Sequence, residues 1–108
     1  MDPRRSEIWW VSLDPTQGSE IKKTRPCLVL TSDVLCRLRR TVVVVPLSSV
    51  AKAHPPITIP VICQGKKAVA VIDQVRAVAK HRLKKKIERA DGKTMESIAA
   101  ALAEILEL

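Results

Sequence analysis

A chain of 108 residues is long enough for one domain, expected here to span residues 1–108, and its 46% hydrophobic and 28% charged residues exclude a disordered protein. Aromatic residues make up only 2%, so Val, Ile, Leu and Ala must build the core, which suits β-strands better than long helices. The net charge is +8, and residues 1–87 carry 17 basic against 6 acidic side chains, which favours nucleic acid as a partner before an anionic membrane surface.

Six short segments rich in β-branched residues, each bounded by breakers, predict strands. They are Glu7–Leu13, Pro26–Thr31, Thr41–Leu47, Ile57–Cys63, Lys67–Ile72 and Gln74–Val78, the last two being separate strands or one bent strand. The third is the most apolar and should lie centrally. Pro46 should fall at its end or at a bulge, because proline cannot donate to a ladder, and Pro60 suits an edge strand. Residues 64–66 predict a turn.

Helical signals occur twice. The polar connector 32–40 suits a short helical turn, and Asp91 is a good cap for a terminal helix. Apolar residues follow that cap at steps of three and four: Met95, Ile98, Ala99, Leu102, Ile105 and Leu106. They predict one apolar stripe along the helix. Short strands followed by one amphipathic helix predict a mostly β fold, a compact barrel with a C-terminal helix.

The three cysteines, Cys27, Cys36 and Cys63, are odd in number and widely spaced, which fits neither a disulfide framework nor paired metal ligands. Cys27 and Cys63 lie in apolar runs and should be small core residues. No apolar run approaches the ~18 residues of a membrane span, and the first residues lack the apolar core of a signal peptide. We therefore expect a cytoplasmic protein in a reducing compartment.

Segment 14–25 combines Pro, Gly, Ser and Thr without periodicity, and loops of this length are often functional. It supplies carboxylates, cations and hydroxyls: Asp14, Thr16, Ser19, Glu20, Lys22, Lys23, Thr24 and Arg25. Pro26 holds Arg25 in extended backbone at the start of a strand. A guanidinium placed there is preorganised to donate two hydrogen bonds to one phosphoryl group. The alternative is an ordinary surface ion pair.

Ser48 and Ser49 follow the most apolar strand, where a hydroxyl could donate to a phosphate oxygen; a turn or cap role is the alternative. His54 and His81 are isolated and fit plain surface positions. The His, Cys, Asp and Glu residues do not cluster with metal-ligand spacing, and three glycines do not make a phosphate-binding loop. We therefore expect neither a metal nor a cofactor.

The run from residue 76 to residue 86 is dense in positive charge. It contributes Arg76, Lys80, Arg82, Lys84, Lys85 and Lys86. Alternate residues on one strand face would form a groove that follows a nucleic-acid backbone, although a solvated charged face on a soluble basic protein fits the same residues. Trp9 and Trp10 point to opposite faces of a strand, so at most one of them is exposed to stack on a base.

Three strings and their spacing carry a family resemblance: EIWWVSLDPTQGSEIKKTRPCLVLTSD, TVVVVPLSS and AVIDQVRAVAKHRL, followed by the terminal amphipathic helix. Together they resemble the MazF/PemK-like toxins of type II toxin–antitoxin systems, over nearly the whole chain from Glu7 onward. The resemblance implies an SH3-like barrel of the CcdB/MazF type, usually a homodimer. It also implies a sequence-selective endoribonuclease, or mRNA interferase, that is held inactive by a cognate antitoxin with an acidic tail.

The same resemblance implies metal-independent cleavage of single-stranded RNA, in which the ribose 2′-hydroxyl attacks and leaves 2′,3′-cyclic phosphate and 5′-hydroxyl ends. It assigns the essential arginine before proline to Arg25, the loop acid to Glu20, and the hydroxyl after the V-P strand to Ser48. We expect Arg25 to be the principal electrostatic catalyst and a possible proton donor, Ser48 to orient the phosphate, and Glu20 to be the candidate base. The expected RNA-binding residues are Thr16, Gln17, Ser19, Lys22, Lys23, Ser49, Gln74, Arg76, Lys80 and Arg82.

Three positions depart from the family pattern. Ser48 stands where Thr is common, Ser6 where a Gly commonly opens the strand, and Ala79 where Asp is usual beside Lys80. Serine keeps the hydroxyl donor of threonine and loses only the methyl that restricts χ1. Two other functions stay open at this point. A CcdB-like DNA gyrase poison shares the expected fold, and a non-catalytic RNA-binding module shares the charge.

Overall fold

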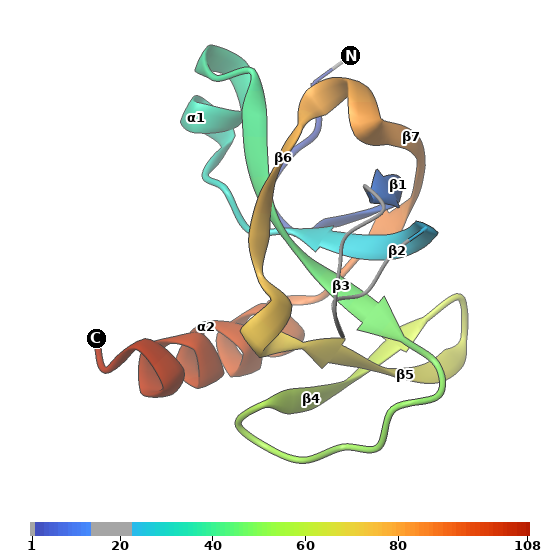
Figure 1. The fold of residues 1–108 in the computed structure, drawn as a ribbon, viewed down its shortest axis with the longest axis vertical. Helices are drawn as coiled ribbons and strands as arrows, with labels where there is room; N and C mark the ends of the chain where they lie inside the picture. The colour runs from blue at the N-terminus through green and yellow to red at the C-terminus, as the bar shows by residue number, and fades with distance from the viewer. Residues whose placement is uncertain (1, 14–22) are drawn as a thin grey trace.

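The computed structural model describes residues 2–13 and 23–108. Within them the chain forms seven strands, two α-helices and two short 3-10 turns, η1 and η2 (Figure 1). In chain order these are β1 (Glu7–Leu13), β2 (Lys23–Val29), α1 (Asp33–Leu38), β3 (Thr41–Ser48), β4 (Thr58–Cys63), β5 (Lys66–Val71), η1 (Ile72–Gln74), β6 (Arg76–Ala79), η2 (Lys80–Arg82), β7 (Leu83–Arg89) and α2 (Gly92–Leu106). None of the helices in this part of the chain is long and apolar enough to cross a membrane.

β3 lies at the centre of an antiparallel sheet whose strand order is β4-β5-β3-β2-β1-β7, which confirms the prediction for this segment. One edge of β3 pairs with β2. The other edge is shared, because the start of β3 pairs with β6 and its end pairs with β5. Figure 1 shows the result: the β4–β5 hairpin and α2 lie at one end of the molecule, and α1 and the β6–β7 connection lie at the other.

Two apolar clusters fill the two faces of the central strands. One includes Ile8, Leu28, Val45, Ile72, Met95 and Ile98, so α2 covers this face. The other includes Val11, Cys27, Val29, Cys36, Val42 and Val44, and reaches α1 through Cys36. Successive side chains of a strand point to opposite faces, so a strand that is buried on both sides has no polar alternation. This explains the apolar run from Val44 to Leu47, whereas Val43 is exposed.

β2 occupies Lys23–Val29, whereas the sequence predicted Pro26–Thr31. It begins earlier because the backbone at residues 23–25 pairs with Val11–Leu13 of β1. Proline at position 26 does not prevent this, since the residue before a proline favours extended backbone. The early start matters for function, because it places Arg25 inside a paired strand rather than in a loop.

Pro46 lies inside β3 and is buried, whereas the sequence predicted a strand end or a bulge. Val44 pairs with β6 and Ser48 pairs with β5, both at the same edge of β3. Pro46 falls between them, where β3 changes partner. A missing N–H costs no ladder hydrogen bond at that gap.

The β4–β5 hairpin follows the prediction closely. β4 ends the sheet, so the expectation that Pro60 lies in an edge strand is confirmed. β4 and β5 are joined by the two residues Gln64 and Gly65, whose φ angles are 54° and 72°. Two positive φ angles are typical of the type I′ turn, whose twist matches that of paired strands.

The basic run 76–86 does not form one strand face, and that prediction is wrong. β6 ends at Ala79, which pairs with Thr41, the first residue of β3, so no ladder partner remains beyond this point. η2 then carries the chain across to β1, where β7 pairs. Lys80 forms an ion pair with Asp2 at 3.1 Å. Asp2, from the N-terminal segment, therefore supplies a carboxylate beside Lys80, which the neighbouring Ala79 does not.

α2 begins as predicted, since the Asp91 carboxylate accepts a hydrogen bond from the Thr94 N–H at 2.8 Å. Hydrogen bonds from Thr94 lower the pKa of Asp91. The buried face differs in part from the predicted stripe. Ala99 and Leu106 are exposed, whereas Ala101 is buried with Met95 and Ile98. Leu102 and Ile105 are partly buried and pack against the same core, so four of the six predicted stripe residues lie on the contact face.

Glu7 is a buried acid at the start of β1. Its carboxylate accepts hydrogen bonds from the Arg4 N–H at 2.8 Å and Trp9 Nε1 at 3.0 Å, and it pairs with Lys86 Nζ at 3.0 Å. Burial acts to raise the pKa of Glu7, but the hydrogen bonds and the charge of Lys86 outweigh it and hold the pKa below its usual value. Glu7 therefore ties the first strand to the last.

We expect the acid sensitivity of the fold to depend on Glu7. Because its pKa is lower in the folded state, its carboxylate stabilises the fold above the unfolded pKa, and this contribution is lost as the pH falls through the folded value. Glu7→Gln should lower the free energy of unfolding at pH 7 and weaken its dependence on pH below about 5. Urea unfolding at several pH values measures both. A variant that keeps the wild-type pH dependence would contradict this role.

Candidate functional site

A cavity of about 310 Å³ opens between the start of β2, the end of β3 and the β4–β5 hairpin. Its lining contains two of the predicted catalytic residues, Arg25 and Ser48, together with the predicted RNA-binding residue Ser49. The remaining lining comes from Trp10, Thr24, Pro26, Leu47, Cys63, Gln64, Lys66, Lys67 and Ala68. Residues from positions 10 to 68 thus meet in one concave site with a guanidinium, two ammonium groups and hydroxyls.

Arg25 projects from the paired part of β2, opposite Val11 of β1. It shares a sheet face with Cys27, and the positive charges of Arg76 and Arg25 both act to lower the pKa of that thiol. Burial acts more strongly and raises the pKa of Cys27 to about 12, so the thiol stays protonated. The core behind Arg25 is therefore neutral, and two guanidinium groups lie on this side of the sheet.

Ser48 is the last residue of β3 and is buried. Its Oγ accepts hydrogen bonds from the N–H groups of Ala51 at 3.1 Å and Val50 at 3.3 Å. The turn role considered for this serine is therefore present. It is compatible with the phosphate role, because a hydroxyl that accepts two hydrogen bonds still has its own hydrogen to donate.

Gln74 and Arg76 lie at the junction between η1 and β6 and do not line the cavity. Arg76 Nη2 donates to Gln74 Oε1 at 3.0 Å, and Arg76 Nε donates to the Gln74 carbonyl at 3.3 Å. Gln74 thus orients Arg76. Arg76 pairs with Val44, two residues before the position opposite Cys27, so it lies on the same sheet face as Arg25.

The other predicted binding residues are dispersed. Lys23 is exposed at the first position of β2 with φ 68°. Arg82 Nη1 donates to the Ser12 carbonyl at 3.3 Å, so it lies against the end of β1. Lys80 pairs with Asp2 beside the first residue of β3, the end opposite Ser48, and the structure does not bring it to the cavity. Thr16, Gln17, Ser19, Glu20 and Lys22 lie outside the described residues.

The sequence reasoning missed the contribution of the β4–β5 hairpin. The cavity is also lined by four residues of this hairpin, Cys63, Gln64, Lys66 and Lys67. Cys63 does not supply a ready nucleophile, because burial and the negative charge of Glu88 raise its pKa. One pattern could have identified Lys66. It lies two residues before Ala68 and four before residue 70, so the alternation of a strand places this lysine on the same side as the core residues.

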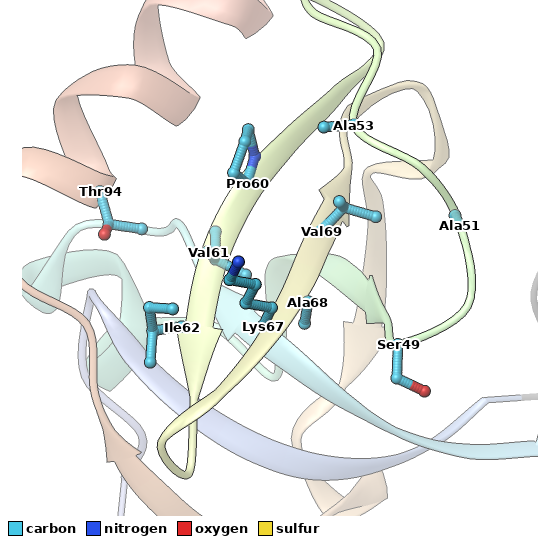
Figure 2. Close-up of a pocket in the computed structure, with 10 residues that line it drawn as sticks. All are labelled: Ser49, Ala51, Ala53, Pro60, Val61, Ile62, Lys67, Ala68, Val69 and Thr94. Atoms are coloured by element: carbon cyan, nitrogen blue, oxygen red, sulfur yellow. The ribbon is translucent and has the colours of Figure 1, made fainter.

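A second hollow, of about 490 Å³, lies against β4 and β5 beside the first (Figure 2). The two share Ser49, Lys67 and Ala68. Figure 2 shows Ser49 and Ala51 on the segment that follows β3, facing the hairpin from one side, with Thr94 of α2 on the other. The lining of this second hollow is mostly apolar, whereas the cationic and hydroxyl groups lie mainly in the first cavity.

Comparison with known proteins identifies the family. Residues 4–106 match the family described as PemK-like, MazF-like toxin of type II toxin-antitoxin system. Endoribonuclease MazF9 of Mycobacterium tuberculosis is 35% identical to this chain, with 97% of each chain covered. Endoribonuclease PemK of Escherichia coli is 36% identical, over 97% of this chain and 83% of its own.

Solved structures share the fold. The crystal structure of MazF from Deinococcus radiodurans superposes with a TM-score of 0.89 at 21% identity, covering 100% of this chain and 99% of its own. An endoribonuclease in complex with its cognate antitoxin, from a mycobacterial species, has a TM-score of 0.80 at 21% identity, covering 98% and 96%. The predicted SH3-like barrel of the CcdB/MazF type with a C-terminal helix is confirmed. The chain therefore belongs to the PemK-like, MazF-like toxins of type II toxin–antitoxin systems, and the relatives named above are endoribonucleases.

Proposed function

We propose that this protein is the toxin of a type II toxin–antitoxin system and that it cuts single-stranded RNA at selected sequences without a metal ion. The observation that carries the proposal is the meeting of Arg25 and Ser48 in one cavity, from two neighbouring strands. A guanidinium and a hydroxyl there can bind the non-bridging oxygens of one phosphate. The surrounding positive charge favours an RNA backbone.

The proposed reaction is an internal transesterification. The ribose 2′-oxygen attacks the adjacent phosphorus, the bond from phosphorus to the 5′-oxygen breaks, and the 5′-oxygen takes up a proton. The products are a 2′,3′-cyclic phosphate and a free 5′-hydroxyl. Charge builds on the phosphorane oxygens, and donors aimed at that charge lower the barrier. Arg25 and Ser48 are assigned to this task.

Proton transfer needs two further roles. The 2′-hydroxyl must lose a proton to a base, and Glu20 is the proposed base, although it lies outside the described residues. Arg25 is ill suited to act as a base, because guanidinium groups keep their proton in proteins. It can instead donate a hydrogen bond to the leaving 5′-oxygen while that oxygen gains charge, and solvent water supplies the proton that completes the 5′-hydroxyl.

The proposed partners are a cognate antitoxin and a second copy of the chain, in the cytoplasm. The solved relative bound to its cognate antitoxin supports the first. An acidic antitoxin segment would suit this chain because residues 1–87 carry 17 basic and 6 acidic side chains. Homodimer formation rests on the family resemblance.

Trp10 lines the cavity and offers a ring on which a base of the RNA can stack.

Incubation of the purified protein with a long single-stranded RNA in EDTA tests the proposed function. We expect discrete fragments that carry 5′-hydroxyl and 2′,3′-cyclic phosphate ends, with the same rate in EDTA and in magnesium. Sequencing of the fragment ends would give the cut site. RNA that stays intact but migrates more slowly would indicate a binding module, and RNA that is neither cut nor bound would direct attention to a gyrase poison. Cutting that stops in EDTA would contradict the metal-independent mechanism.

A further inference from the structure

We propose that Lys66 is a second phosphate-binding residue of the cleavage pocket and holds the backbone phosphate next to the scissile one. The proposal rests on the proposed function, since it assigns a role within the same RNA site. It concerns a lysine of the β4–β5 hairpin that lines the same cavity as Arg25.

The register of the hairpin decides where Lys66 points. Lys66 pairs with Cys63, and Ala68 pairs with Val61. Cys63, Val61 and Ala70 are buried in the apolar core, so this face of the hairpin is the core-facing one. Lys66 follows the same alternation but lies one step beyond the last core residue, where it is exposed and lines the cavity. The neighbouring residue, Lys67, starts from the opposite face.

The turn that carries Lys66 is held rigidly. Gln64 and Gly65 both have positive φ angles, and such a turn fixes the register of the two strands. The Gln64 N–H also donates to Glu88 Oε2 of β7 at 2.7 Å. A hydrogen bond to a carboxylate is stronger than one between neutral groups. The backbone of Lys66 is therefore fixed from two sides, and the ammonium group does not need a loop rearrangement to reach the cavity.

The charges around the cavity suit a chain of phosphates. Arg25 and Ser48 come from adjacent strands, and Lys66 lines the same cavity from the β4–β5 hairpin. Neither of the ion pairs Lys80–Asp2 and Lys86–Glu7 involves Lys66. A cavity of about 310 Å³ is at the small end of the range for ligand sites and suits a single nucleotide. A nucleotide within an RNA chain is flanked by two phosphates, so one phosphate can lie at Arg25 while the next lies at Lys66.

Lys66→Met tests the proposal, with Lys66→Arg and Lys93→Met as comparison variants. Methionine keeps an unbranched apolar stem and removes the ammonium charge, whereas arginine keeps a positive charge. Lys93 is exposed on the first turn of α2 and does not line the cavity. Lys93→Met therefore lowers the net charge by the same amount as Lys66→Met, but at a position away from the cavity. Thermal unfolding of each variant checks that the fold is kept.

The readout is binding of a single-stranded RNA with a 2′-deoxyribose at the cut site, which cannot be cut because the attacking hydroxyl is absent. Each phosphate contact with a single strand contributes about 0.7 to the slope of log affinity against log salt concentration. Lys66→Met should reduce the slope by about that amount, and Lys66→Arg should restore it. In cleavage assays at low salt, the KM of Lys66→Met should rise about ten-fold with little change in kcat.

Two results would overturn the proposal while leaving the proposed function intact. The first is a Lys66→Met protein that binds and cuts RNA like Lys93→Met. The second is a loss of kcat with unchanged salt slope, which would place Lys66 away from the neighbouring phosphate. A wild-type protein that does not cut RNA would instead refute the proposed function, and this outcome is read in the same assays before any variant is compared.

Discussion

Replacement of Arg25 by alanine should abolish RNA cleavage, with a fall in kcat/KM of about 10³-fold or more. Its guanidinium lies on a paired strand and lines the cavity together with Ser48. A fork of donors held at one phosphoryl group stabilises the charge that appears only in the transition state, so its removal lowers kcat and not only affinity. Cleavage of a single-site RNA substrate under single-turnover conditions measures the loss.

Two comparison variants make this result specific. Arg25→Lys keeps the positive charge without the planar fork and should recover only part of the rate. Arg39→Ala removes an exposed arginine near the end of α1 and should leave cleavage unchanged. Binding of the 2′-deoxy substrate and thermal unfolding show whether Arg25→Ala still folds and binds. Undiminished cutting by a folded Arg25→Ala protein would refute the assignment.

The parts of the fold that follow from local chemistry could be predicted from the sequence. β1 has the predicted bounds, the Gln64–Gly65 turn falls where a glycine follows a polar residue, and Asp91 caps α2. Each depends on backbone preferences or spacing within a few residues. The C-terminal helix on a mostly β fold follows from the same signals.

Predictions that depended on distant partners were less accurate. The position of Pro46 inside β3 is permitted by a change of partner from β6 to β5 at one edge, which leaves no mark near residue 46. The basic run after β6 looked like one strand face, but it turns at Lys80 because β3 offers no partner beyond Thr41. Pairing between strands far apart in the sequence decided both cases.

The candidate site shows the same division. Pro26 marks Arg25 as a candidate and the preceding V-P strand marks Ser48, and both residues line the cavity. Lys66 had no such neighbour to mark it, since a lysine beside a turn is usually solvated. Its significance comes from Arg25, which lies far earlier in the chain and lines the same cavity because the strands between them pair in one sheet.

Replacement of Ser48 by alanine should lower the cleavage rate by about 10²-fold, which is the typical effect of removing one donor from a charged transition state. The Ser48 hydroxyl accepts hydrogen bonds from the N–H groups of Val50 and Ala51, so its own hydrogen is free to point at the phosphate. Alanine removes the donor and both acceptor contacts together. Ser48→Thr keeps all three functions and should cut RNA at close to the wild-type rate.

A further variant separates the turn from the phosphate contact. Ala51→Pro removes the N–H that donates to Ser48 Oγ at 3.1 Å but leaves the hydroxyl in place. If the hydroxyl acts on the phosphate, this variant should lose much less activity than Ser48→Ala. If it acts only by holding the backbone after β3, Ala51→Pro, which removes one of the two backbone contacts, should lose a comparable share of the activity. The ratio of the two single-turnover rates therefore decides whether Ser48 contacts the substrate or only shapes the cavity.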